Sequence, residues 1–265
     1  MVAFEIEDLQ VVILAGGLGT RLSEETILKP KPMVEIGGRP ILWHIMKTYA
    51  SFGVTNFIIC LGYRGYIIKE YFANYALHTS DFTVDLGTKS VSVIRHEPES
   101  WKVSLVDTGL ETSTGGRIKR IGHLLQGGLP FLLTYGDGLG DIDIRSTVNQ
   151  HASGQALVTV TAVRPPGRFG NLRLSTNTVL DFSEKPAGDG GLVSGGYFVV
   201  SPKALEYVRG DDTSWEGESM RDLAAAGAVD AFIHEGFWHP MDTSRDKMAL
   251  ENLWSTGRAP WKVWK

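Results

Sequence analysis

A short apolar run that leads directly into glycine constrains this chain most. Val11–Ala15 is uninterrupted and largely β-branched, and Gly16, Gly17 and Gly19 follow it. Such a run predicts a strand that is buried on both faces. Glycines at its end let the backbone approach a ligand closely and turn N–H groups toward it. This pattern predicts a ligand loop at the carboxyl end of a buried strand.

Strand and helix patterns alternate after this loop. Apolar residues recur at helical spacing over 41–52, a second strand pattern covers 55–61, and a helical pattern covers 66–77. This order is typical of βαβ units and predicts a mixed, mainly parallel sheet flanked by helices. Further strands are expected at 91–95, 103–107, 131–135, 156–163, 172–174, 179–182 and 197–200, and further helices at 117–125, 202–208, 218–226 and 244–254. We therefore expect an α/β fold with a β-rich part beyond about residue 155.

Charge and cysteine content exclude several classes of protein. The 26 Lys and Arg against 30 Asp and Glu give a net charge of −4, which argues against nucleic acid or an anionic membrane as partner. Cys60 is the only cysteine, so neither an intramolecular disulfide nor a cysteine-based zinc site can form. The first ten residues lack the pattern of a signal peptide, and no apolar run is long enough to span a bilayer. A cytoplasmic protein is expected.

Three cations follow the glycine loop within a short stretch. Arg21, Lys29 and Lys31 lie close in sequence, although the chain as a whole is acidic. The loop lacks the third glycine of the dinucleotide fingerprint and the Gly-Lys-Ser/Thr of a P-loop. A guanidinium binds phosphate oxygens in a fork and a lysine acts on them as a point charge. The loop is therefore a candidate phosphate site of another type.

Two aspartates occupy positions with both a functional and a structural interpretation. Asp137, in Tyr135-Gly-Asp-Gly138, follows a strand pattern, where open α/β sheets bind ligands, but it could also shape a turn. Asp242 could cap the helix that follows it. Asp141 and Asp143 resemble the Asp-x-Asp metal motif of glycosyltransferases, or they belong to a solvated helix start.

The motifs taken together resemble those of the sugar-1-phosphate nucleotidyltransferases. The resemblance runs from LAGGLGTRLSEET and KPKPMVEIGGRPILWHIM through GYRGYIIKEYFANY, TGGRIKR, TYGDG, PPGRFG, EKP and MDT to APWK. It implies a Rossmann-like nucleotidyltransferase fold. It also implies that a sugar 1-phosphate attacks the α-phosphorus of an NTP with Mg²⁺, releasing diphosphate. The SEET and KPKPM forms resemble the members that use CTP and α-D-glucose 1-phosphate to make CDP-glucose.

The resemblance also implies a role for individual residues. Catalytic residues would be Arg21, Lys31 and Asp137, and the metal ligands would be Asp137 and Asp242. Nucleotide-binding residues would be Leu14, Ala15, Gly16, Gly17, Leu18, Gly19, Thr20, Arg21, Lys31, Thr112, Arg117 and Gly136. The sugar phosphate would be bound by Glu184, Lys185, Gly195, Gly196 and Trp238.

The organisation expected from the resemblance is a single domain over 11–265, after an extension at 1–10 that has no assigned role. Residues about 11–150 would bind the nucleotide, and about 151–265 would bind the sugar and form a homo-oligomer. Three alternatives remain: another NTP or sugar, a catalytically silent homologue that binds nucleotide sugars, and a glycosyltransferase. Arg21, Lys31, Asp137 and Asp242 favour an active nucleotidyltransferase, because silent relatives tend to lose such residues.

Overall fold

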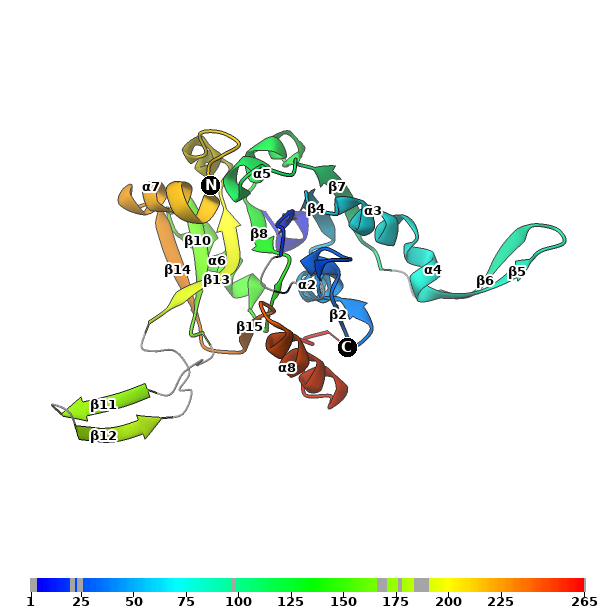
Figure 1. The fold of residues 1–265 in the computed structure, drawn as a ribbon. Helices are drawn as coiled ribbons and strands as arrows, with labels where there is room; N and C mark the ends of the chain where they lie inside the picture. Colours follow the sequence, from blue (N-terminus) through cyan, green and yellow to red (C-terminus); the bar gives the residue numbers. More distant parts are fainter. Residues whose placement is uncertain are drawn as a thin grey trace.

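A seven-stranded sheet forms the centre of the molecule (Figure 1). The computed structural model describes residues 4–19, 22, 26–96, 99–165, 171–175, 178–183 and 191–264. The strands lie in the order β14-β10-β13-β8-β1-β4-β7, and β13 is the one that runs antiparallel to its neighbours. Their bounds are β1 (Gln10–Ala15), β4 (Asn56–Leu61), β7 (Lys102–Asp107), β8 (Phe131–Tyr135), β10 (Val158–Val163), β13 (Val193–Val200) and β14 (Val229–His234). The predicted mixed, mainly parallel sheet is confirmed.

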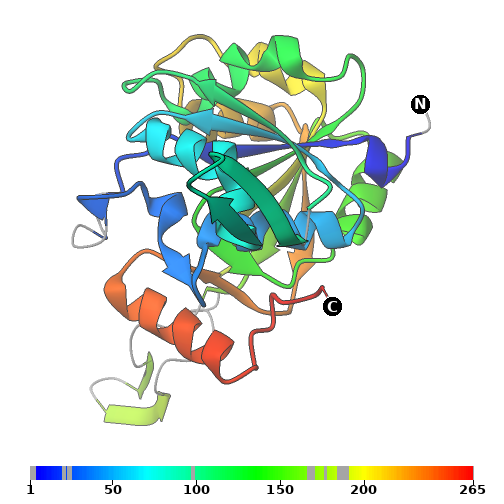
Figure 2. The same cartoon turned by 90° about the vertical axis from the view of Figure 1, so that its right-hand side faces the viewer.

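Helices cover both faces of this sheet, as the apolar run in β1 requires (Figure 2). Val11 and Ile13 of β1 pack into one core with α2 and α6, whereas Val12 and Leu14 pack into a second core with α5 and α7. The α-helices are α2 (Ile41–Ser51), α3 (Gly65–Ala73), α4 (Tyr75–Thr79), α5 (Thr114–Arg120), α6 (Ile144–Ser153), α7 (Met220–Ala225) and α8 (Ser244–Ser255). Shorter helical segments are η1 (Ile6–Asp8), η3 (Lys31–Met33), η4 (Gly122–Leu124), η5 (Pro202–Tyr207) and the π-helical η6 (Trp215–Ser219).

Within the described residues, four small two-stranded ladders accompany the central sheet. They pair β2 (Glu35–Ile36) with β3 (Arg39–Pro40), β5 (Ser80–Asp85) with β6 (Ser90–His96), β9 (Gly138–Gly140) with β15 (Trp238–Pro240), and β11 (Asn171–Ser175) with β12 (Thr178–Ser183). The β5–β6 hairpin extends away from the body (Figure 1). None of the helices in the described ranges is long and apolar enough to cross a membrane.

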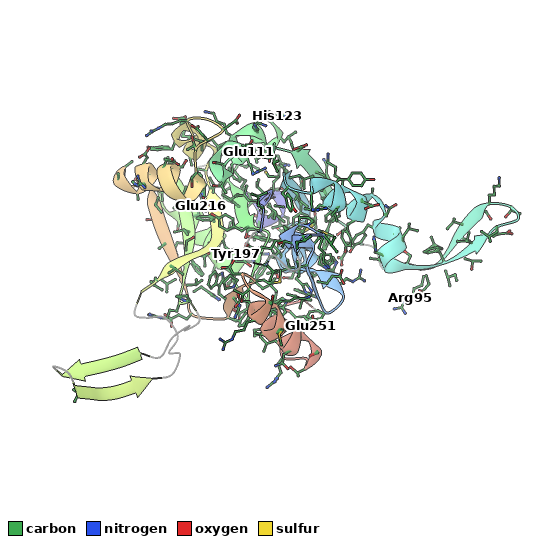
Figure 3. The ribbon with its side chains drawn as sticks, viewed as in Figure 1. Arg95, Glu111, His123, Tyr197, Glu216 and Glu251 are labelled. Atoms are coloured by element: carbon green, nitrogen blue, oxygen red, sulfur yellow. The ribbon has the colours of Figure 1, made fainter. Side chains whose placement is uncertain are left out.

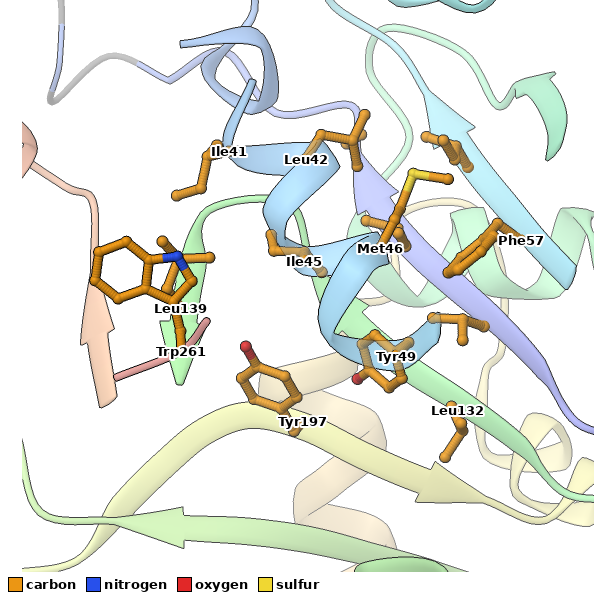
Figure 4. Packing of buried hydrophobic residues seen from close by; sticks show 14 of the residues in the cluster. Ile41, Leu42, Ile45, Met46, Tyr49, Phe57, Leu132, Leu139, Tyr197 and Trp261 are labelled. Carbon is orange, nitrogen blue, oxygen red and sulfur yellow. The ribbon is translucent and has the colours of Figure 1, made fainter. Parts of the chain in front are cut away.

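Helix α2 packs its apolar stripe against the part of the sheet that carries the site. Ile41, Ile45 and Tyr49 face Leu139 and Tyr197 (Figure 4). The rings of Tyr49 and Tyr197 stack with centroids 6.0 Å apart. This packing places β9 and β13 beside the carboxyl end of β8.

Several predicted elements differ from the observed ones in their bounds. The helix expected over 66–77 is divided at Asn74, which ends α3 and precedes α4. The helix expected over 117–125 begins at Thr114 and ends at Arg120. The helix expected over 218–226 is π-helical up to Ser219. Strands β5 and β14 were not expected, because their residues are mostly exposed or half-buried and their apolar pattern is short.

Candidate active site

A cavity of about 470 Å³ opens where β1 and β8 end. Parallel strands present their carboxyl ends at one edge of a sheet, so the loops after them meet there. The cavity is lined by Leu14, Ala15, Gly16, Gly17, Gly19, Lys31, Pro32, Thr112, Ser113, Thr114, Arg117, Tyr135, Gly136, Asp137, Ser214 and Glu216. Most of the residues that the sequence assigned to a nucleotide therefore surround one space.

Three of the assigned nucleotide residues are not among those lining residues. Leu18 is 55% exposed and is not part of the lining. Thr20 and Arg21 lie outside the described residues. The glycine pattern has a clear structural basis at Gly136, where an added Cβ would lie 2.8 Å from Pro32 Cγ. Gly136 N also donates to Leu14 O (3.1 Å), which brings the loops after β1 and β8 together.

Lys31 meets two carboxylates at one end of this cavity. Its Nζ lies 2.7 Å from Asp137 Oδ2 and 2.7 Å from Asp242 Oδ1. The side chains of Lys31 and Asp242 are 9% and 12% exposed, whereas that of Asp137 is 34% exposed. An ammonium and two carboxylates this close form a strong electrostatic cluster, because burial reduces the screening by water.

The pairing of β9 with β15 brings the two aspartates together. Gly138 lies opposite Pro240, so the residues just before β9 and just after β15 are neighbours. Met241 N donates to Asp137 O (2.8 Å), which extends the ladder to the site. Thr243, and not Asp242, caps α8, since Thr243 Oγ1 accepts from Asp246 N (3.2 Å). The interpretation of Asp242 as a helix cap is therefore wrong.

The aspartate pair has the donor set of a divalent-cation site that a substrate would complete. Both carboxylates already converge on one cationic group, the Lys31 ammonium. No cluster of three or more His, Cys, Asp or Glu suited to a metal occurs among the described residues. Mg²⁺ commonly takes one or two carboxylates together with substrate phosphates and water, so Asp137 and Asp242 fit this ion.

Arg117 lines the cavity, but its guanidinium is bonded to the protein itself. Nη1 donates to Leu61 O (2.9 Å), Thr108 Oγ1 (2.8 Å) and Gly109 O (2.7 Å), and Nη2 donates to Gly16 O (3.3 Å). These acceptors belong to the segments that end β1, β4 and β7. The side chain is buried, and this desolvation lowers the pKa of Arg117. Arg117 thus joins three loops of the nucleotide cavity, a role that the sequence did not predict.

A smaller cavity of about 70 Å³ adjoins the first and shares Asp137 with it. Gly195, Gly196 and Trp238, three of the residues assigned to the sugar, line it. Trp238 Nε1 donates to Gly195 O (2.7 Å), so the indole is fixed against β13. Glu184 and Lys185, the other two assigned residues, lie outside the described part of the chain.

Tyr135 and Glu216 are cavity residues that the sequence analysis missed. The Tyr135 hydroxyl donates to Glu216, which also accepts from Thr114 Oγ1 (2.6 Å). Burial and the nearby Glu216 carboxylate raise the pKa of Tyr135. Glu216 comes from η6, and Figure 3 labels it together with Tyr197 of β13. Tyr135 adjoins the Asp137 motif and could have been found, whereas nothing local marks Glu216.

Asp141 and Asp143 do not form a pair at a common site. Asp143 caps α6 by accepting from Ser146 N (2.9 Å), as a helix start requires. Asp141 Oδ1 instead accepts from Phe237 N (2.7 Å) and lies 3.0 Å from His234 Nε2. The expectation of a solvated helix start is right for Asp143 and wrong for Asp141. The glycosyltransferase alternative therefore loses its proposed metal motif.

Comparison with known proteins identifies similar sequences over almost the whole chain. The profile of the nucleotidyl transferase family matches residues 10–239. The chain is 54% identical to the glucose-1-phosphate cytidylyltransferase of Salmonella typhi over 257 residues, which are 97% of this chain and 100% of that protein. It is 42% identical, with the same coverage, to a probable glucose-1-phosphate cytidylyltransferase of Bacillus subtilis strain 168. The solved structure of HddC from Yersinia pseudotuberculosis has the same fold, with a TM-score of 0.69, 24% identity and coverage of 93% and 99% of the two chains.

Proposed function

Because this chain belongs to the nucleotidyl transferase family, we propose that its cavity converts CTP and α-D-glucose 1-phosphate into CDP-glucose and diphosphate. One observation carries the proposal: Lys31, Asp137 and Asp242 meet at one end of the cavity, where it adjoins a second cavity. The identity to glucose-1-phosphate cytidylyltransferases over nearly the full length supports this base and this sugar.

The reaction needs positioning and charge neutralisation more than a protein nucleophile. An oxygen of the sugar phosphate attacks the α-phosphorus in line, and diphosphate leaves as that new P–O bond forms. Lys31 lines this cavity beside Asp137, and we assign its ammonium to the α-phosphate. Arg21, by resemblance, holds the phosphates that leave.

Asp137 and Asp242 would hold Mg²⁺ between them. When bound there, Mg²⁺ neutralises phosphate charge and makes the α-phosphorus more electrophilic. Asp137 lines both cavities, so its carboxylate lies where the two substrates would meet. The two aspartates thus orient the reacting phosphates relative to each other.

The smaller cavity would bind the hexose. Trp238 provides a flat apolar wall, and the backbone of Gly195 and Gly196 allows a close approach. Glu184 and Lys185 would reach the sugar phosphate by resemblance. The proposed nucleotide part is about 11–150 and the proposed sugar part about 151–265, although Ser214 and Glu216 of the second part also line the nucleotide cavity.

We also propose a cytoplasmic homo-oligomer. Cys60 is a buried free thiol, which suits a reducing compartment. The surface that suggests the oligomer lies outside 151–265, where the contacts were expected: Phe82 pairs with Val93 and Val84 with Val91, so the β5–β6 hairpin carries an exposed apolar face. A two-stranded ribbon with such a face is stabilised when another surface covers it, and a second copy of the chain would do so.

Diphosphate release tests the proposed activity directly. The enzyme is assayed with Mg²⁺ and CTP, UTP, dTTP or ATP, each with α-D-glucose 1-phosphate and two other sugar 1-phosphates. We expect turnover to be highest with CTP and glucose 1-phosphate. Faster turnover with a different pair would replace the substrate assignment. Nucleotide binding without turnover for any pair would favour the silent homologue.

A further inference from the structure

The ammonium of Lys31 lies between the two carboxylates that would hold a divalent cation. Both Nζ to oxygen distances are 2.7 Å, which is the length of a charge-assisted hydrogen bond. Lys31 is 106 residues from Asp137 and 211 from Asp242 in sequence. The fold, and not local sequence, therefore produces this contact.

The backbone of Lys31 is fixed, whereas its ammonium can move. Lys31 begins η3, with Pro30 before it and Val34 N donating back to Lys31 O (3.1 Å). Its Cβ also packs close to Gly19 in the phosphate loop. A lysine head group sits on a flexible four-carbon stem, so it can turn from the aspartates toward the cavity without a change in the backbone.

Binding of a divalent cation beside the Lys31 ammonium costs electrostatic free energy. A divalent ion between the carboxylates would lie beside the ammonium in a region that is largely buried, where like charges repel strongly. An arriving nucleotide changes this balance, because its phosphates offer the ammonium a new anionic partner. The same phosphates supply oxygen ligands that the two aspartates alone lack.

We propose that Lys31 is the resident counter-ion of Asp137 and Asp242 and excludes divalent metal until a nucleotide phosphate draws its ammonium away. This inference rests on the proposed function, since it takes the aspartates as the metal ligands. Lys31 then has two positions in one reaction cycle: on the carboxylates in the free enzyme, and on phosphate in the loaded one. The metal site is assembled only when substrate is present.

Mn²⁺ binding to the nucleotide-free protein tests this proposal without any measurement of activity. Mn²⁺ accepts the oxygen ligands that Mg²⁺ uses, and its free ion is quantified by electron paramagnetic resonance. We expect weak binding to the wild type and at least tenfold tighter binding to Lys31→Met. The double variant Lys31→Met/Asp137→Asn should lose this gain, which shows that the aspartate pair is the site.

Lys29→Met is the matched control for the loss of one positive charge. Lys29 lies two residues away and is not among the cavity residues; its Nζ instead pairs with Glu35 Oε1 at 3.3 Å. Its substitution should leave Mn²⁺ affinity unchanged. Equal Mn²⁺ affinity in the wild type and Lys31→Met, or an equal gain in both lysine variants, would overturn the proposal.

A second measurement needs no variant, in case Lys31→Met does not fold. Inorganic diphosphate is added to wild-type protein, and the total bound Mn²⁺ is measured. The Mn²⁺ that the same concentration of diphosphate binds without protein is subtracted. We expect at least tenfold tighter binding of Mn²⁺ to protein with diphosphate than without it. Tight Mn²⁺ binding without any phosphate would refute the inference. Absence of turnover in the substrate panel would instead count against the proposed function, so the two failures are distinguishable.

Discussion

Replacing Arg117 by methionine should destabilise the protein even when no nucleotide is present. Methionine keeps most of the apolar stem but removes every guanidinium donor. The bonds to Leu61 O and Thr108 Oγ1 and the longer bond to Gly16 O are buried, so water cannot easily replace the donor. A buried acceptor without its donor costs free energy that an exposed one does not.

The magnitude follows from these three bonds. We assign each bond about 1–1.5 kcal/mol of the free energy of unfolding, below the roughly 1.5–3 kcal/mol usual for hydrogen bonds to charged groups, because two of the three acceptors keep another donor. Gly16 O keeps Tyr63 N as a donor (3.2 Å) and Leu61 O keeps Thr108 N (2.9 Å), so neither oxygen is left alone. Removing a buried charge also recovers part of its desolvation cost. We therefore expect a loss of about 2–3 kcal/mol, a large part of a typical domain stability.

Urea unfolding at 25 °C, followed by circular dichroism, measures this loss. Arg120→Met is the matched control, because Arg120 lies on the same helix but pairs with Asp211 at the surface (2.6 Å). Its loss should be clearly smaller. If Arg117 served only to contact the nucleotide, Arg117→Met would weaken CTP binding and leave the unfolding curve unchanged. A loss of unfolding free energy below about 1 kcal/mol, or equal losses in both variants, would refute the role of Arg117 in joining the three loops.

Two further predictions concern the aspartate pair and a buried histidine. Asp137→Asn should lower metal-dependent turnover by orders of magnitude while the circular dichroism spectrum is retained; turnover within about tenfold of wild type, or about 1.4 kcal/mol, would exclude Asp137 as a metal ligand. Desolvation lowers the pKa of His44 to about 4, whereas an unfolded histidine titrates near 6.5. The unfolded state thus binds the extra proton first, so the free energy of unfolding should fall by up to about 3 kcal/mol between pH 6.5 and 4. The urea midpoint should depend less on pH over this range in His44→Gln than in the wild type. An equal pH dependence in both proteins would contradict the assignment of this effect to His44.

Local sequence patterns predicted the elements at the centre of the fold. The apolar run in Val11–Ala15 and the helical spacing over 41–52 each depend on residues within a few positions of one another. Burial of β1 on both faces could be predicted from the sequence, because all of its residues except Gln10 are apolar. The class of fold followed from the alternation of such segments.

Elements at the edges of the molecule were less predictable. Strand β14 is six residues long and shows no regular alternation of apolar and polar residues, and its pairing with β10 decides that it is a strand. The helix expected over 66–77 is divided at Asn74, and residues 215–219 are π-helical, although neither feature was predicted from the local pattern. Short patterns carry too little information to decide such cases alone.

The cluster of Lys31, Asp137 and Asp242 separates what the sequence predicts from what only the tertiary structure determines. The sequence by itself placed Asp137 after a strand and Lys31 after a glycine loop, and the resemblance named Asp242 as the second metal ligand beside Asp137. It could not decide whether Asp242 was a helix cap, because the neighbouring Thr243 could also take that position. The structure shows that Thr243 accepts the capping bond and that the pairing of β9 with β15 brings Asp242 to Asp137. The sequence also could not show that Arg117 binds the carbonyls of three loops. Spacing along a chain determines local conformation, whereas contacts between distant segments exist only once the sheet has brought their ends together.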